Sequence, residues 1–219
     1  KENLAGIEDY TRIGSLLQPE QIVKYGELTL RENQIAYAEP SFFRLFDFEL
    51  LKGDKKTCLS MPGQVVITER IASKYFKDED PIGKIFIFTG AYDKISCEVT
   101  GVMKEMPSNS HIHYSFLISY KSLPKYMQEY WYKHEAYTYV LLDSPERKAE
   151  IEREFPVMAE KYKTDEALKN KTWGVSLIPL ADIHLPPQVG YEAETKGNRS
   201  SMIALIFAAI AILAIAWIN

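Results

Sequence analysis

The sequence lacks the short motifs that mark most catalytic centres. The only Gly-Lys pair, Gly83-Lys84, has neither the leading glycine nor the following Ser or Thr of a phosphate-binding loop. No GxSxG, HExxH or paired CxxC motif occurs. The chain is therefore not expected to hydrolyse ATP itself, and we predict no catalytic, cofactor-binding or metal-binding residues.

Histidine is scarce, with four in the chain. His111 and His113 have the spacing that places two side chains on one face of a strand, where both rings can reach one metal ion. No third ligand is evident nearby. We therefore prefer to interpret the two histidines as polar surface residues, or as structural residues whose hydrogen bonds are satisfied within the fold. His134-Glu135 and the pair formed by Asp182 and His184 are weaker signals.

Cysteine is scarcer still, with two in the chain, and the sequence leaves the state of the two thiols open. Cys97 sits in an alternating apolar stretch and is expected to be a small buried residue, whereas Cys58 sits in a polar loop. The pair could form a disulfide in an oxidising compartment. The net charge of −4 and the lack of a Lys/Arg stripe argue against nucleic acid as a partner.

Long apolar runs are absent except at the end of the chain. Every residue from Met202 to Ile218 is apolar, a run of 17 residues without a polar stripe. A bilayer core needs about 17–25 such residues, so we predict the start of a transmembrane helix at 202–219. A buried helix or an interfacial hairpin is the alternative. Residues 1–201 carry nearly all the charge and are predicted to form one domain outside the membrane.

The pattern of residues 1–201 mixes strands and helices without a repeat, which is typical of the α+β class. Thr68 is a good N-cap for a helix over 69–76, and Ser41 for a short aromatic helix. Ser144-Pro145 is typical of a helix start, and Pro156 predicts a kink or a break near 154–155. The remaining expectations are a helical turn at 18–24, a helix at 123–131, and strands at 7–13, 28–30, 35–38, 65–67, 84–89, 95–102, 113–119, 137–142 and 173–179.

Aromatic side chains gather between residues 126 and 139. Core packing of a small subdomain is one interpretation. The other is an interaction surface, because Tyr and Trp are enriched at protein interfaces. The residues that we assign to this candidate surface are Tyr126, Tyr130, Trp131 and Tyr132.

Several blocks together resemble the periplasmic core domain of MacB/FtsX-type ABC transporter permeases, most of all those of Bacteroidetes-like bacteria. The blocks are YAEPSFFRLFDFELLKGD (37–54), VVITERIASKYFKDEDPIGK (65–84), VTGVMKEMPSNSHIHYSFLIS (99–119), PLADIHL (179–185) and the apolar exit at 197–219. The specificity lies in their order and spacing. The region 123–171 diverges most from the family pattern.

The resemblance implies a porter-like α+β domain with a small inserted β-rich subdomain at roughly 47–110. It places residues 1–201 on the periplasmic side of the inner membrane, between two transmembrane helices. It further implies a permease dimer, a cytoplasmic ATPase subunit that hydrolyses the ATP, and in some systems a periplasmic adaptor or an outer-membrane protein.

In that family the domain transmits ATPase-driven movement across the membrane. The substrate class would be an antimicrobial peptide, a lipophilic compound or a lipoprotein. Two alternatives remain: an extracytoplasmic ligand-sensing domain of a signalling protein, and a surface protein with a single C-terminal anchor.

Overall fold

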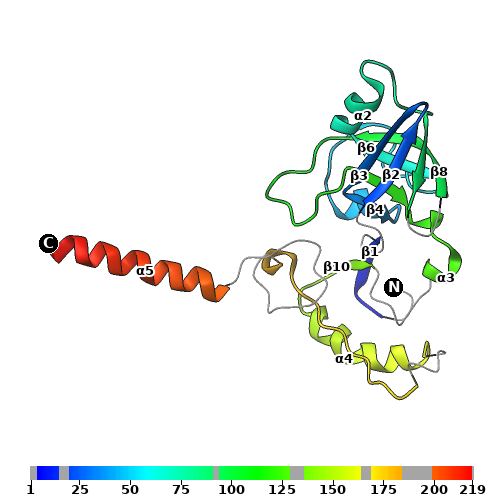
Figure 1. Ribbon diagram of the computed structural model, residues 1–219. Helices are drawn as coiled ribbons and strands as arrows, with labels where there is room; N and C mark the ends of the chain where they lie inside the picture. The colour runs from blue at the N-terminus through cyan, green and yellow to red at the C-terminus, as the bar shows by residue number, and fades with distance from the viewer. Residues whose placement is uncertain are drawn as a thin grey trace. The chain divides into compact units, whose positions relative to one another are not determined.

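The computed structural model describes residues 4–14, 20–90, 94–128, 136–163, 169–183 and 199–218. The chain divides into two units, residues 1–176 and 177–219, which are described separately. The first unit is an α+β domain built on one large sheet, as predicted (Figure 1).

The sheet has ten strands in the order β10-β1-β4-β9-β6-β8-β7-β2-β3, with β5 paired to β8. Two neighbouring pairs, β4 with β9 and β6 with β8, are parallel, and the others are antiparallel. The strands are β1 (Ile7–Gly14), β2 (Glu20–Tyr25), β3 (Leu28–Asn33), β4 (Ile35–Ala38), β5 (Leu50–Lys52), β6 (Gln64–Thr68), β7 (Ile85–Thr89), β8 (Lys94–Met103), β9 (Phe116–Ser119) and β10 (Tyr137–Leu142).

The helices of the first unit are short apart from one. They are α1 (Phe42–Leu45), α2 (Glu69–Phe76), the 3-10 turn η1 (Tyr120–Ser122), α3 (Lys125–Gln128) and α4 (Arg147–Glu160). Helix α2 packs against β6 and β8, and in Figure 1 it lies on the far side of the domain from β1, β10 and α4.

The central strands are buried on both faces, so their sequences are almost continuously apolar. Alternate residues enter two hydrophobic clusters. Val65 and Ile67 of β6 point into cluster 1, and Val66 between them points into cluster 2. The buried members of cluster 1 are Val23, Ile35, Tyr37, Val65, Ile67, Ile71, Tyr75, Phe76, Phe86, Phe88, Cys97, Val99, Val102, Phe116, Ile118, Tyr120 and Leu123, so it extends along the sheet from β4 to β2. Those of cluster 2 are Ile13, Ala36, Ala38, Phe42, Phe43, Cys58, Leu59, Val66, Met103, Met106, Ile112, Tyr114 and Leu117. This double burial makes the sheet the rigid centre of the domain.

Local signals explain the unit formed by β6 and α2. Thr68 ends the strand in extended conformation, and its hydroxyl accepts a hydrogen bond from the backbone N–H of Ile71 at 3.4 Å. Tyr75 and Phe76 are buried in cluster 1. The hydroxyl of Tyr75 donates to the buried Glu32 carboxylate at 2.8 Å, and burial together with this bond raises the pKa of Tyr75. The predicted N-cap is thus confirmed here.

Other local predictions were wrong. Ser41 precedes α1, but its side chain makes no capping hydrogen bond. Residues 20–25 form β2, because they pair with β3 and β7 instead of forming a helical turn. The strand predicted at 28–30 is longer than expected, because residues 31–33 continue β3, and only Gln34, with φ of 59°, separates it from β4.

Two further predictions concern residues 144–179. Helix α4 continues through Pro156, so of the predicted kink or break the break is wrong. The proline removes one helical N–H, and on this partly exposed helix water can satisfy the carbonyl that loses its partner. Residues 173–179 do not form the predicted strand, although Trp173 and Val175 are partly buried and alternate with exposed neighbours.

The predicted insertion at 47–110 contains β5 to β8. These strands lie in the same sheet as β4 and β9, because β6 pairs with both β8 and β9. The position and limits of an inserted subdomain stay a prediction.

The two cysteines are both buried and free, and they lie on opposite faces of the sheet. Cys97 belongs to cluster 1, as expected for a small core residue. Cys58 belongs to cluster 2, so its side chain is not on the polar surface that the sequence suggested. A disulfide between them would have to pass through the sheet, which its short geometry forbids.

Burial raises the pKa of Cys58 to about 11 and that of Cys97 to about 12. Because unfolded thiols ionise near pH 9, folding holds both protons more tightly than the unfolded chain does. The stability that this contributes is complete below pH 9 and is lost as the pH rises toward 11–12. Between pH 8 and pH 10 we expect the free energy of unfolding to fall by about 2 kcal/mol more than in the Cys58→Ala/Cys97→Ala variant. Urea titrations at both pH values measure this, and equal losses would contradict it.

The second unit contains the 3-10 turn η3 (Leu180–Asp182) and helix α5 (Arg199–Ile218). The side chains of residues 202–217 are exposed in this unit. Within the described part of the chain, no helix is both long enough and apolar enough to cross a membrane. The membrane span predicted for 202–219 therefore stays a prediction.

Candidate interaction surface

The aromatic segment assigned from sequence is only partly described. Tyr126 lies on α3 and is 65% exposed. Tyr130, Trp131 and Tyr132 lie outside the described residues. Tyr137 and Tyr139, further along, belong to β10. Tyr139 packs against cluster 2, and burial raises the pKa of its hydroxyl, so core packing is its role.

Helix α3 is short, and contacts with η1 hold it in place. The side-chain amide of Gln128 donates to the backbone oxygens of Leu123 at 2.6 Å and Lys121 at 3.3 Å. Met127 packs against cluster 1, on the same helix that exposes Tyr126. Tyr126 is thus presented from a fixed base.

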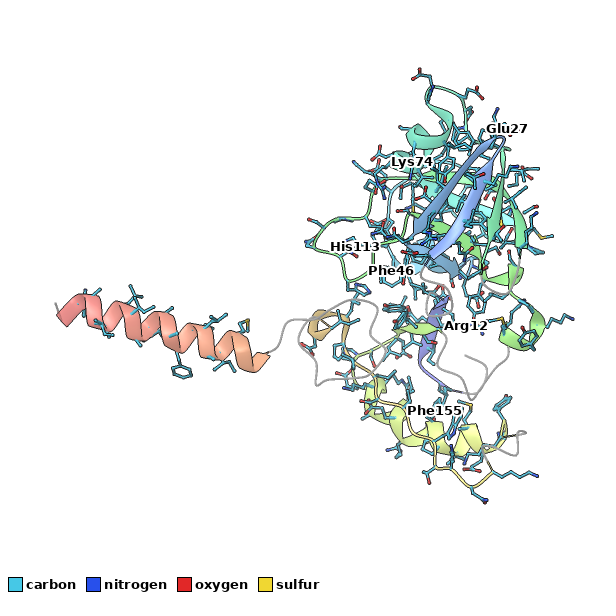
Figure 2. The ribbon with its side chains drawn as sticks, viewed as in Figure 1. Arg12, Glu27, Phe46, Lys74, His113 and Phe155 are labelled. Carbon is cyan, nitrogen blue, oxygen red and sulfur yellow. The ribbon has the colours of Figure 1, made fainter. Side chains whose placement is uncertain are left out.

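Arg12 ties this base to the sheet. Its guanidinium donates from Nε to the Glu39 carboxylate at 2.9 Å and from Nη1 to the backbone oxygen of Gln128 at 2.6 Å. The same group lies 4.3 Å from the ring centre of Tyr120. Figure 2 shows Arg12 on β1. One planar cation therefore joins β1 to the segment after β4, to η1 and to the end of α3.

Replacing Arg12 with methionine is expected to destabilise the domain by about 2 kcal/mol, since it leaves the partly buried Glu39 carboxylate and the Gln128 carbonyl without their donor. Amide hydrogen exchange at 125–128 should also accelerate. The matched control is Arg31→Met, because Arg31 pairs with Glu20 at 3.4 Å with both side chains well exposed. That change should cost no more than about 0.5 kcal/mol. Equal effects of the two substitutions, measured by urea denaturation, would contradict the role given to Arg12.

A second support lies beside η1: the loop Thr57–Gly63. Lys121 donates from Nζ to the backbone oxygen of Ser60 at 2.7 Å, and the backbone N–H of Gly63 donates to Oγ of Ser122 at 2.9 Å. The loop exposes Met61, whose side chain is 60% accessible. Sequence reasoning singled out neither Arg12 nor Met61. The Ser-Met-Pro-Gly turn at 60–63 was a signal for the loop, but nothing in the pattern indicated what it packs against.

The histidine pair is engaged with other groups. Nε2 of His111 lies 3.1 Å from the hydroxyl of Tyr139, and Nε2 of His113 lies 3.0 Å from the backbone oxygen of Pro107. Within the described ranges no group of three or more His, Cys, Asp or Glu side chains is placed to hold a metal ion. His134, Glu135 and His184 lie outside those ranges.

Comparison with known proteins gives a family and a fold. The family described as MacB-like periplasmic core domain matches residues 1–156. A search of curated proteins found no match. The chain therefore belongs to the family of MacB-like periplasmic core domains, as the resemblance implied.

Three solved structures share the fold. A domain of a permease protein from Porphyromonas gingivalis is 23% identical with a TM-score of 0.62, and the match covers 76% of each chain. The periplasmic region of MacB from Actinobacillus actinomycetemcomitans is 14% identical with a TM-score of 0.52, covering 74% of this chain and 70% of that one. The extracellular domain of the noncanonic ABC-type transporter YknZ from Gram-positive bacteria is 16% identical with a TM-score of 0.52, covering 76% and 82%.

Proposed function

We propose that this MacB-like periplasmic domain of an ABC transporter permease transmits ATPase-driven conformational change across the inner membrane. A separate cytoplasmic ABC ATPase subunit binds and hydrolyses the ATP, and two permease copies act together. Residues 1–201 lie on the periplasmic side. The observation that carries the proposal is the family match over residues 1–156.

The architecture of the domain suits movement as a rigid body. A transmitting domain must not absorb movement by internal deformation, and a sheet buried on both faces deforms little because its packed interior resists compression. Arg12 adds a fixed link between β1 and the C-terminal end of α3. Movement applied to β1 would therefore reach Tyr126 without intervening flexible backbone.

The candidate surface would then contact a partner protein. We propose that Tyr126, with Tyr130, Trp131 and Tyr132, contacts a periplasmic adaptor or an outer-membrane protein. Tyr126 is exposed on a supported base, and Tyr and Trp are among the residue types that dominate binding energy at interfaces. The transported substrate would be an antimicrobial peptide, a lipophilic compound or a lipoprotein.

The buried thiols make a direct test practical. Cys58 and Cys97 are buried, so once cysteines elsewhere in the permease and the ATPase are replaced, a cysteine introduced by Val157→Cys on the exposed face of α4 takes a spin label selectively. In the full-length permease with its ATPase, the label distance between two copies should change by several ångströms when ATP and vanadate trap the closed ATPase. An ATPase variant unable to bind ATP is the control and should show no change. Identical distances in both samples would refute mechanical transmission through this domain.

A further inference from the structure

The loop Thr57–Gly63 is built to hold its shape. Two buried residues anchor it, since Cys58 and Leu59 belong to cluster 2. Side chains of neighbouring strands bind its carbonyls: Oγ1 of Thr100 donates to the oxygen of Cys58 at 2.6 Å, and Oγ of Ser119 donates to the oxygen of Leu59 at 2.9 Å. A loop so constrained has little conformational entropy to lose on binding.

The residue that this loop presents is apolar. The backbone N–H of Met61 donates to Oε1 of Gln64 at 2.8 Å, which fixes the turn, while the side chain stays exposed. Because the loop and α3 are both bonded to η1, Met61 and Tyr126 project from two neighbouring, fixed supports. Met and Tyr are among the residue types enriched at protein interfaces.

The charge around these two side chains differs from that of the whole chain. The segments 55–68 and 106–128 contain no Asp or Glu, although the chain has 30 acidic residues and a net charge of −4. Lys56, Lys121 and Lys125 are exposed on them. Two flanking carboxylates are engaged: Asp54 accepts from the backbone N–H of Lys56 at 2.6 Å, and Glu39 pairs with Arg12. The exposed Glu98 of β8, whose backbone N–H donates to the oxygen of Gly63 at 2.8 Å, is the acidic residue beside the loop.

We propose that Met61, Tyr126 and the lysines 56, 121 and 125 form a docking surface for a protein that presents Asp and Glu side chains around an apolar contact. Opposite charge would guide the encounter, and the two apolar side chains would supply the buried contact. Three lysines fall short of the four to eight basic residues typical of a site for anionic lipid. The inference rests on the proposed function only in placing this partner outside the membrane.

The test places a photo-reactive benzophenone amino acid at Met61 or at Tyr126 of the full-length protein in its native membrane. After irradiation, mass spectrometry identifies the cross-linked peptides. The matched control position is Val157, which is apolar and 70% exposed but lies on α4 among acidic residues. Each variant is prepared with Lys56→Glu/Lys125→Glu and, separately, with Lys56→Arg/Lys125→Arg. Circular dichroism of each variant checks that it folds.

We expect both positions to cross-link to the same partner protein, through peptides rich in Asp and Glu, and Val157 not to. The yield should fall at least about fivefold with the two glutamates and persist with the two arginines. Cross-links to lipid, to a second copy of this chain or to nothing would overturn the inference. A cross-linking yield that is the same with glutamates and with arginines at positions 56 and 125 would overturn it too. The ATPase is quantified in the same samples. Its presence without the partner cross-link refutes only the docking surface, whereas its absence refutes the proposed function.

Discussion

Replacing Gly53 with alanine is expected to lower the free energy of unfolding by about 3 kcal/mol or more. Gly53 follows β5 with φ of +97°, a conformation that L side chains rarely adopt. A Cβ atom there would lie 2.4 Å from the backbone oxygen of Thr100 and 3.0 Å from Cα of Gly101. The clash is with backbone of the central strand β8, so no side-chain rotation relieves it, and β5 must separate from β8.

Gly26 provides the matched control. It has φ of +55° in the turn between β2 and β3, but no atom lies within 4 Å of the position that its Cβ would take. Gly26→Ala therefore carries only the backbone cost of about 1 kcal/mol. Thermal unfolding followed by circular dichroism should show a Tm about 9 °C lower for Gly53→Ala and about 3 °C lower for Gly26→Ala. Equal shifts would mean that the close approach of β5 to β8 does not constrain the fold.

Truncating Phe86 to alanine is expected to cost about 3–5 kcal/mol, because it opens a cavity at the centre of cluster 1. Phe86 is completely buried. Its ring centre lies 4.9 Å from that of Tyr75, 5.3 Å from that of Phe76 and 5.9 Å from that of Phe116. One side chain on β7 thus joins helix α2 to strand β9.

The neighbouring residue tests whether burial is the cause. Ile85 is 57% exposed on the same strand, so Ile85→Ala should change the free energy of unfolding by no more than about 0.5 kcal/mol. Urea denaturation of both variants makes the comparison. A small loss for Phe86→Ala would show that cluster 1 does not hold α2 on the sheet.

Sequence reasoning located the elements whose signals are local. The hydroxyl of Thr68 and the apolar spacing after it specify α2 within nine residues. The strands predicted at 84–89 and 95–102 are likewise β7 and β8, which are neighbours in the chain and pair antiparallel. In both cases the determining residues are close in the chain, so the pattern carries the information.

The same reasoning failed where the structure of a segment depends on pairing with strands that are distant in the sequence. A helical turn was predicted at 18–24, yet residues 20–25 are a strand because they pair with β3 and β7. Their side chains alternate between exposed and buried, as in any strand of a sheet. The order of strands in the sheet could not be read either, since β4 pairs with β9 across some 80 residues. Such long-range contacts leave no trace in local periodicity.

The candidate site shows the same division. Tyr126 stood out from composition alone, whereas Arg12 acquires its role from Glu39, 27 residues away, and from Gln128, 116 residues away. Met61 is likewise defined by the hydrogen bonds that η1 makes with its loop. Composition predicted a candidate surface, and only the fold shows what holds Tyr126 in position.

The most direct test of the central claim is isolation of the full-length protein from its native membrane in mild detergent, followed by quantitative mass spectrometry of the associated proteins. A permease domain predicts an ABC ATPase subunit in an amount about equal to that of this protein. A histidine kinase or another signalling partner, recovered without any ATPase, would contradict the account and favour a sensing domain.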